Sequence, residues 1–141
     1  RAGFAEETGR GPGLGANFNL PLPRNASESA YLAALDRAVE AVARHTPDTL
    51  VLSFGSDIRR GDPEGYFDLG PESFITIGAR IAAAGLPTLV VQEGGYALRS
   101  LARAVPALLD ALSGRRSRCS PEFRRNTSSR NANVERARHS A

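Results

Sequence analysis

The sequence predicts an α/β fold, a parallel sheet with helices on both faces. Two short apolar runs, residues 49–54 and 87–91, are typical of strands buried on both sides of a sheet. Stretches with helical periodicity precede and follow these runs. Strands that alternate with helices favour a parallel sheet covered by those helices. Only three or so strands are expected, which make a thin sheet, so the chain is interpreted as part of a larger doubly wound domain.

The first 45 residues predict a loop, a short strand and a helix, in that order. The glycine-rich run 9–15 neither follows a strand nor opens a helix, as a dinucleotide-binding loop does, so we do not expect it to bind phosphate. Residues 17–20 alternate polar and apolar side chains, which is typical of a short strand. From 25 to 45, apolar residues recur at helical spacing behind a candidate N-cap, Ser27. His45 falls in the last turn, where a cation favours the helix dipole.

Residues 55–113 predict a long loop and two more helices around the second strand. The loop covers 55–70, and loops longer than about a dozen residues in compact domains are often functional. The next helix is expected to open at Pro71 and to stop at Gly85, a common residue just past a helix C-terminus. The last helix is expected over 97–113. Pro106 should kink it or begin a second segment, because proline removes a backbone donor.

Charge divides the chain into two parts. Residues 1–113 hold 10 Arg against 13 acidic residues, a net charge of −3, whereas 114–141 hold 8 Arg against 2, a net charge of +6. Residues 114–141 are rich in Ser, Asn and Arg and poor in apolar side chains, so we expect a disordered tail. Such a basic tail can bind nucleic acid non-specifically, although a merely solvated tail is favoured. We therefore predict a domain over 1–113 and a tail over 114–141.

The cysteine content and the hydropathy of the chain indicate its broad class of protein. The single Cys119 excludes an intramolecular disulfide framework. No apolar run approaches the ~20 residues that span a bilayer, and nothing resembles a signal peptide. We expect a soluble, cytoplasmic protein with no membrane partner, and a homo-oligomer is compatible with the sequence. The chain begins at Arg1 and contains no Met, so we expect a fragment or a processed chain.

Two chemically informative side chains follow the predicted strands. Asp57 comes shortly after the first strand, and Tyr96 follows Gly94 and Gly95 after the second. In parallel α/β sheets, ligands gather just past the carboxyl ends of the strands. A carboxylate is a hard metal ligand, and a protonated phenol donates to a developing oxyanion. The two glycines allow a tight turn that aims the ring over the strand ends. The pattern indicates part of a hydrolytic metal site.

Each of these residues also has a structural interpretation. Asp57 could close its loop through an Asx-turn, and Tyr96 could pack at a strand–helix corner. Asp62, which a proline follows, indicates a turn. Glu64 and Glu93 are the other acids near the strand ends, and either could pair with a cationic substrate or with an arginine. Spacing alone leaves these alternatives open.

Five stretches together resemble the C-terminal half of the zinc-dependent deacetylases, the arginase-like superfamily of histone deacetylases and acetylpolyamine amidohydrolases. They occur in family order over about residues 3–113, and they are 5–9 (AEETG), the glycine loop with 17–23, 47–57, 61–67 and 91–96 (VQEGGY). The first and last of them look closer to the bacterial acetylpolyamine branch and to class II histone deacetylases than to class I. The resemblance implies a multi-stranded parallel sheet flanked by helices, with zinc at the strand ends.

The resemblance also implies roles for individual residues. Asp57 would be one of three protein ligands of Zn²⁺, and Tyr96 the phenol that polarises the acetyl carbonyl. Gly94 and Gly95 would form the substrate-binding turn beside it. Glu64 falls where polyamine-selective members carry a glutamate that recognises a distal amine. Zinc and a general-base histidine would activate water, and acetylpolyamine or acetyl-lysine would yield acetate and a free amine, with acetylpolyamine slightly preferred.

The chain departs from the family in what it lacks. The family's other two zinc ligands, an Asp and a His, and its His-His pair lie upstream of the position of Arg1. One carboxylate cannot form a three-ligand catalytic zinc site, so we expect the chain alone to bind zinc weakly and to be inactive. An alternative is a non-catalytic remnant that serves as an interaction module, with its Arg-rich tail contacting nucleic acid. An arginase with two manganese ions is disfavoured, because a second carboxylate would be expected near Asp57.

Overall fold

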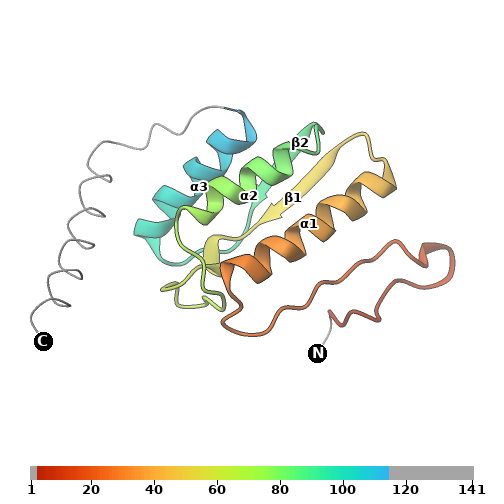
Figure 1. The fold of residues 1–141 in the computed structure, drawn as a ribbon, viewed down its shortest axis with the longest axis horizontal. Helices are drawn as coiled ribbons and strands as arrows, with labels where there is room; N and C mark the ends of the chain where they lie inside the picture. Colours follow the sequence, from red (N-terminus) through yellow and green to blue (C-terminus); the bar gives the residue numbers. More distant parts are fainter. Residues whose placement is uncertain (1–2, 115–141) are drawn as a thin grey trace, which may run out of the picture.

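A pair of parallel strands organises the computed structural model of the chain, which describes residues 3–114 (Figure 1). The strands lie in register, with Leu52 opposite Val90. Parallel pairing confirms the predicted α/β class, but the described residues form two strands rather than three. The elements in order are η1 (Gly11–Gly13), α1 (Glu28–His45), β1 (Leu50–Phe54), η2 (Ser56–Ile58), α2 (Ser73–Ala82), β2 (Thr88–Gln92) and α3 (Leu98–Leu112).

Residues 3–25 form an extended arm in place of the expected first strand (Figure 1). The prediction of a strand over 17–20 is wrong. The arm folds back on itself, because the Asn17 side-chain amide donates to the Glu7 carbonyl and the Asn19 side-chain amide donates to the Phe4 carbonyl at 2.8 Å. These contacts hold a loop rather than a strand. The predicted tail and Cys119 lie outside the described residues.

The helices follow the local signals in the sequence closely. The Ser27 hydroxyl accepts a hydrogen bond from the Ala30 amide at 3.3 Å, which confirms this residue as the N-cap of α1. His45 is the last residue of α1, as predicted. Gly85 has a φ of 68° and follows the end of α2, as expected for a helix stop. Helix α3 continues through Pro106 as one segment, so the alternative of a second segment there is wrong. No helix in the described part of the chain is long and apolar enough to cross a membrane.

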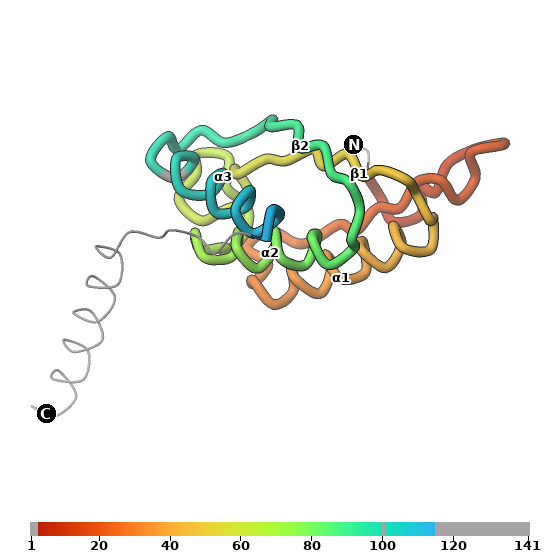
Figure 2. Tube along the Cα trace, turned by 90° about the horizontal axis from the view of Figure 1, so that it is seen from above, coloured from red at the N-terminus to blue at the C-terminus, as the bar shows by residue number. Residues whose placement is uncertain are grey.

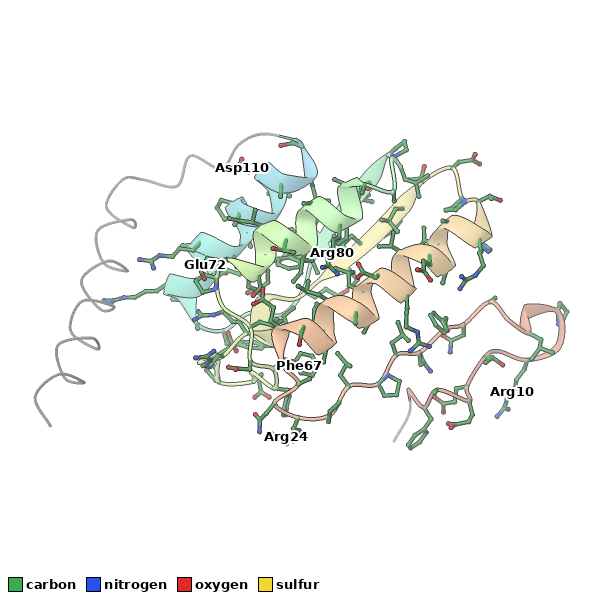
Figure 3. The ribbon with its side chains drawn as sticks, in the orientation of Figure 1. Arg10, Arg24, Phe67, Glu72, Arg80 and Asp110 are labelled. Atoms are coloured by element: carbon green, nitrogen blue, oxygen red, sulfur yellow. The ribbon has the colours of Figure 1, made fainter. Side chains whose placement is uncertain are left out.

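The core lies between the sheet and the three helices, all of which pack on the same side of the two strands (Figure 2). Phe54 at the end of β1 packs edge-on against Phe74 of α2, with ring centroids 5.8 Å apart. Arg80 of α2 points toward α1 (Figure 3), where it donates to the Leu32 carbonyl at 2.9 Å. The buried core side chains are Phe54, Phe74, Ile77, Ile81, Ala104 and Leu108.

The other face of the sheet is exposed within the described residues. Val51, Leu89 and Val91 are 62%, 58% and 42% exposed. The prediction that both strands are buried on both faces is therefore wrong for this structure. The physical reason is the placement of all three helices on the opposite face, which leaves no described element to cover these side chains.

Candidate functional site

The parallel pairing extends beyond the strands and brings the two predicted site segments together. The Glu93 amide donates to the Phe54 carbonyl at 2.8 Å, and the Ser56 amide donates to the Gly94 carbonyl at 2.9 Å. This ladder fixes the start of loop 55–70 beside the turn that follows β2. The two loops therefore leave the same edge of the sheet, where ligands collect in parallel α/β folds.

A cavity of about 600 Å³ opens at this edge, and three of the predicted site residues line it. Asp57 reaches it from η2, directly past β1, and Tyr96 reaches it from the turn past β2. Glu64 reaches it from the long loop. The structure thus brings together side chains that are up to 39 positions apart in the sequence. The described residues that line the cavity are Asp57, Ile58, Pro63, Glu64, Tyr66, Phe67 and Tyr96.

The two glycines have different roles, although the sequence suggested one shared turn. Gly95, just before Tyr96, has a φ of 136°, a backbone conformation that glycine adopts freely and other residues rarely do. Gly94 has no positive φ. A methyl group there would overlap the Asp57 carboxylate, which packs against its backbone. Gly94 therefore provides the space that lets the carboxylate lie between the two loops.

The Asp57 carboxylate accepts no hydrogen bond from the described residues, so it does not make the Asx-turn that the sequence left open. It is half-buried and its oxygens remain available to a ligand. An aspartate suits zinc chemically, since carboxylate oxygen is one of its usual ligands. No group of three His, Cys, Asp or Glu side chains that could hold a metal occurs within residues 3–114. The described residues thus fit one position of a zinc site.

The long loop is held by the segment that precedes α1. The Asn25 amide donates to the Tyr66 carbonyl at 2.5 Å, and the Asp68 amide donates to the Ala26 carbonyl at 3.0 Å. The Phe67 ring lies near the start of α1 (Figure 3), where its centroid is 5.7 Å from that of Tyr31. These contacts connect the wall of the cavity to a helix far from it in sequence.

Asp62 makes hydrogen bonds beyond those of the turn that the sequence predicted. It is 8% exposed, and its Oδ1 accepts from the Glu64 amide at 3.1 Å, which confirms the predicted turn. Its Oδ2 accepts from the amides of both Tyr96 and Ala97, each at 2.9 Å. Burial alone would raise the pKa of Asp62. The three amide donors, at Ala97, Tyr96 and Glu64, together with the Arg59 guanidinium outweigh burial and lower that pKa.

Glu93 lies apart from the cavity. Its side chain accepts a hydrogen bond from the Ser53 hydroxyl, and both residues are exposed at the end of the sheet. It does not line the cavity, so the alternative in which it pairs with a cationic substrate has no support in this structure.

Sequence patterns did not identify four of the residues that line the cavity. Ile58, Pro63, Tyr66 and Phe67 are loop residues, and a loop has no periodicity that would indicate which side chains face a cavity. The signals were the length of the loop and the family-like stretch 61–67, neither of which indicates which side chains face the cavity. The Tyr66 ring also lies under Arg24, whose guanidinium carbon is 4.2 Å from the ring centroid.

The paired parallel strands and the helices packed against them make this an α/β protein with part of the arginase–deacetylase fold. A carboxylate and a phenol lie on one cavity past the ends of these strands. Residues 1–112 match the histone deacetylase domain family. The chain belongs to that family.

Individual relatives agree with this assignment. The chain is 46% identical over 100 residues to an acetylpolyamine amidohydrolase of Burkholderia pseudomallei, covering 71% of this chain and 29% of the relative. It is 42% identical over 99 residues to acetylpolyamine amidohydrolase 1 of Pseudomonas aeruginosa, covering 70% and 29%. A crystal structure of the acetylpolyamine aminohydrolase from Burkholderia pseudomallei superposes with a TM-score of 0.77 at 41% identity, covering 79% of this chain and 32% of that one. The chain therefore spans less than a third of the length of these relatives.

Proposed function

We propose that this chain forms the C-terminal part of a zinc-dependent deacetylase that removes acetyl groups from acetylated amines. The observation that supports the proposal is the placement of Asp57 and Tyr96 on one cavity, past the ends of two paired parallel strands. Membership of the histone deacetylase family indicates which reaction such a site would perform.

Asp57 would supply one carboxylate ligand to zinc. It is suited to this because its oxygens accept no hydrogen bond from the described residues, and because Gly94 leaves room for the carboxylate beside the strand ends. The bound zinc ion would supply the Lewis acidity that makes water nucleophilic at neutral pH.

Tyr96 would donate its phenolic proton in a hydrogen bond to the acetyl oxygen as negative charge develops there. A tyrosine hydroxyl is a hydrogen-bond donor, so it can stabilise such an oxygen. In the overall reaction, water adds to the acetyl carbon, the C–N bond breaks, and acetate and a free amine leave. The amine nitrogen takes a proton as the bond to carbon is lost.

Glu64 would favour substrates that carry a second positive charge. Its carboxylate lines the same cavity as Asp57 and Tyr96, so it can attract an amine at a distance from the acetyl group. The two bacterial relatives described above are acetylpolyamine amidohydrolases. Acetylpolyamine is therefore preferred to acetyl-lysine in protein as the substrate class.

The test begins with the coding sequence directly upstream of this chain. We expect it to encode, in frame, a His-His pair and an Asp and a His close together. The joined polypeptide should deacetylate acetylspermidine when zinc is present. An open reading frame that begins near Arg1 would overturn the proposal.

The role of Tyr96 is tested in the joined polypeptide by Tyr96→Phe. We expect kcat to fall by about 100-fold or more, as when an oxyanion donor is removed. Tyr31→Phe is the matched control, since Tyr31 lies on α1 and does not line the cavity. Equal activity in the two variants would exclude Tyr96 as the oxyanion donor.

A further inference from the structure

The segment that carries Tyr96 contains two glycines, which restrict the backbone little. Contacts from elsewhere in the chain are therefore needed to fix its conformation. Gly94 and Gly95 precede the tyrosine, and Gly95 adopts a φ of 136°, a region that glycine enters freely. Helix α3 begins two residues later, and its N-cap residue, Ala97, has no side chain that could cap the helix. The Tyr96 ring is itself 59% exposed, so packing holds it only in part.

Asp62 provides the missing constraint. Its Oδ2 accepts hydrogen bonds from the amides of Tyr96 and Ala97, which are 34 and 35 residues away in the sequence. The two amides lie at the start of α3, where the helix dipole favours a negative charge. The aspartate thus binds, from another loop, the two amides that directly precede α3, and it fixes the backbone that carries the phenol.

The loop around Asp62 is ordered by hydrogen bonds of its own, so Asp62 holds the Tyr96 and Ala97 amides against a structured segment. The Asp62 carbonyl accepts from the Gly65 amide at 2.9 Å, and its Oδ1 accepts from the Glu64 amide. The same loop carries Asp57, five positions earlier. Asp62 therefore ties the segment that bears the metal-ligand candidate to the segment that bears the phenol.

We propose that Asp62 is a positioning residue of the deacetylase reaction, which holds the Tyr96 phenol over the cavity by binding the Tyr96 and Ala97 amides. This proposal rests on the function proposed above. It makes Asp62 necessary for the geometry of the oxyanion donor, although its carboxylate does not line the cavity. Misplacing a catalytic group by about 1 Å can cost about 100-fold in rate.

The first test measures the constraint itself in the 141-residue chain. Amide hydrogen exchange at Tyr96 and Ala97, resolved by NMR, should become faster by about tenfold or more in Asp62→Ala. Asp68→Ala is the matched control, since this exposed aspartate on the same loop contacts Arg60 instead. In Asp62→Asn the side-chain oxygen can still accept from both amides, so exchange should stay closer to the wild type. Unchanged exchange in Asp62→Ala would overturn the proposal.

The second test asks whether Asp62 acts through Tyr96, using kinetics of the joined polypeptide with acetylspermidine. Asp62→Ala should lower kcat by about 100-fold with little change in KM, and Asp62→Asn should recover part of that loss. In the Tyr96→Phe background, Asp62→Ala should lower kcat by less than about threefold, because the group it positions has already been removed. A general loss of folding would not produce this dependence on Tyr96.

The outcomes separate the two proposals. If Asp62→Ala lowers kcat by the same factor in both backgrounds, Asp62 does not act through Tyr96 and the positioning role is wrong. If Tyr96→Phe leaves kcat unchanged while the amides still respond to Asp62→Ala, the constraint is real, but the function proposed for Tyr96 fails and the catalytic part of this inference fails with it.

Discussion

At the scale of single residues, the absence of a side chain at Gly94 decides where Asp57 lies. Since a methyl group there would overlap the Asp57 carboxylate, Gly94→Ala should displace this side chain from its place beside the segment after β2. We expect the free energy of unfolding to fall by about 1 kcal/mol, the lower end of the usual cost of overpacking, because the overlapping atoms belong to a side chain and not to the backbone. Urea unfolding measures this. Gly13→Ala is the control, because a methyl group at Gly13 meets nothing within 4 Å. Equal stability of the two variants would contradict the prediction.

Asp62 should make the stability of the protein depend on pH. Its folded-state pKa is lowered, against about 3.9 for an aspartate in an unfolded chain. The unfolded chain therefore binds more protons in this range, and stability rises with pH. The contribution of Asp62 is fully present above about pH 4 and is lost as pH falls through the folded-state pKa.

Urea unfolding between neutral and acidic pH checks this dependence against the Asp62→Asn variant. We expect the wild type to lose more stability than Asp62→Asn as the pH falls, because the variant has no carboxylate to protonate at this position. Parallel curves for the two proteins would show that the three amide bonds to Asp62 do not lower its pKa in solution.

At the scale of elements, α2 packs tightly against α3 at Gly78. A methyl group there would lie 2.8 Å from the Leu108 carbonyl oxygen and from the Ala111 side chain. Alanine favours a helix by about 1 kcal/mol over glycine, but the overlap should cost more than that. Gly78→Ala should therefore lower the melting temperature. Ala79→Ser, at an exposed position of the same helix, should change stability by less than about 0.5 kcal/mol. A stabilised Gly78→Ala would show that the helices can separate at little cost.

At the scale of the whole molecule, the outer face of the sheet is apolar and uncovered by any described residue. Val51, Leu89 and Val91 are its large apolar side chains. Exposed apolar surface of this kind binds hydrophobic dyes and partners. We expect the 141-residue chain to bind the dye ANS, and Val51→Thr combined with Leu89→Thr to reduce its fluorescence. Leu14→Thr, at an exposed leucine of the arm, is the control. No dye binding by the wild type would contradict the prediction.

The isolated chain should also bind zinc weakly and show no deacetylase activity. Within residues 3–114, Asp57 is not accompanied by the further ligands that a catalytic zinc site requires. Calorimetric titration with zinc and an assay with acetylspermidine or an acetyl-lysine peptide measure the two properties. Asp57→Asn should weaken zinc binding further. Strong zinc-dependent deacetylation by the 141-residue chain would contradict this expectation.

Features that depend on neighbouring residues could be predicted from the sequence. The apolar runs predicted two parallel strands, Ser27 predicted the start of a helix and Gly85 its end, and all three were confirmed. Local propensity and turn chemistry act over a few residues, so they can be recognised in a single chain. Residues 17–20 show the limit of this approach, because an alternating pattern forms a strand only when a neighbouring strand is available to pair with it.

The assembly of the site depends on tertiary contacts between segments that are far apart in the sequence. The sequence indicated Asp57 and Tyr96, but their common cavity depends on hydrogen bonds that continue past both strands. The link from Asp62 to the start of α3 could not be predicted, because nothing in a turn signal indicates a partner 34 residues away. Which face of the sheet is exposed also depends on tertiary structure, because the packing of the helices determines it. These features arise from contacts between distant residues, which a pattern along one chain does not specify.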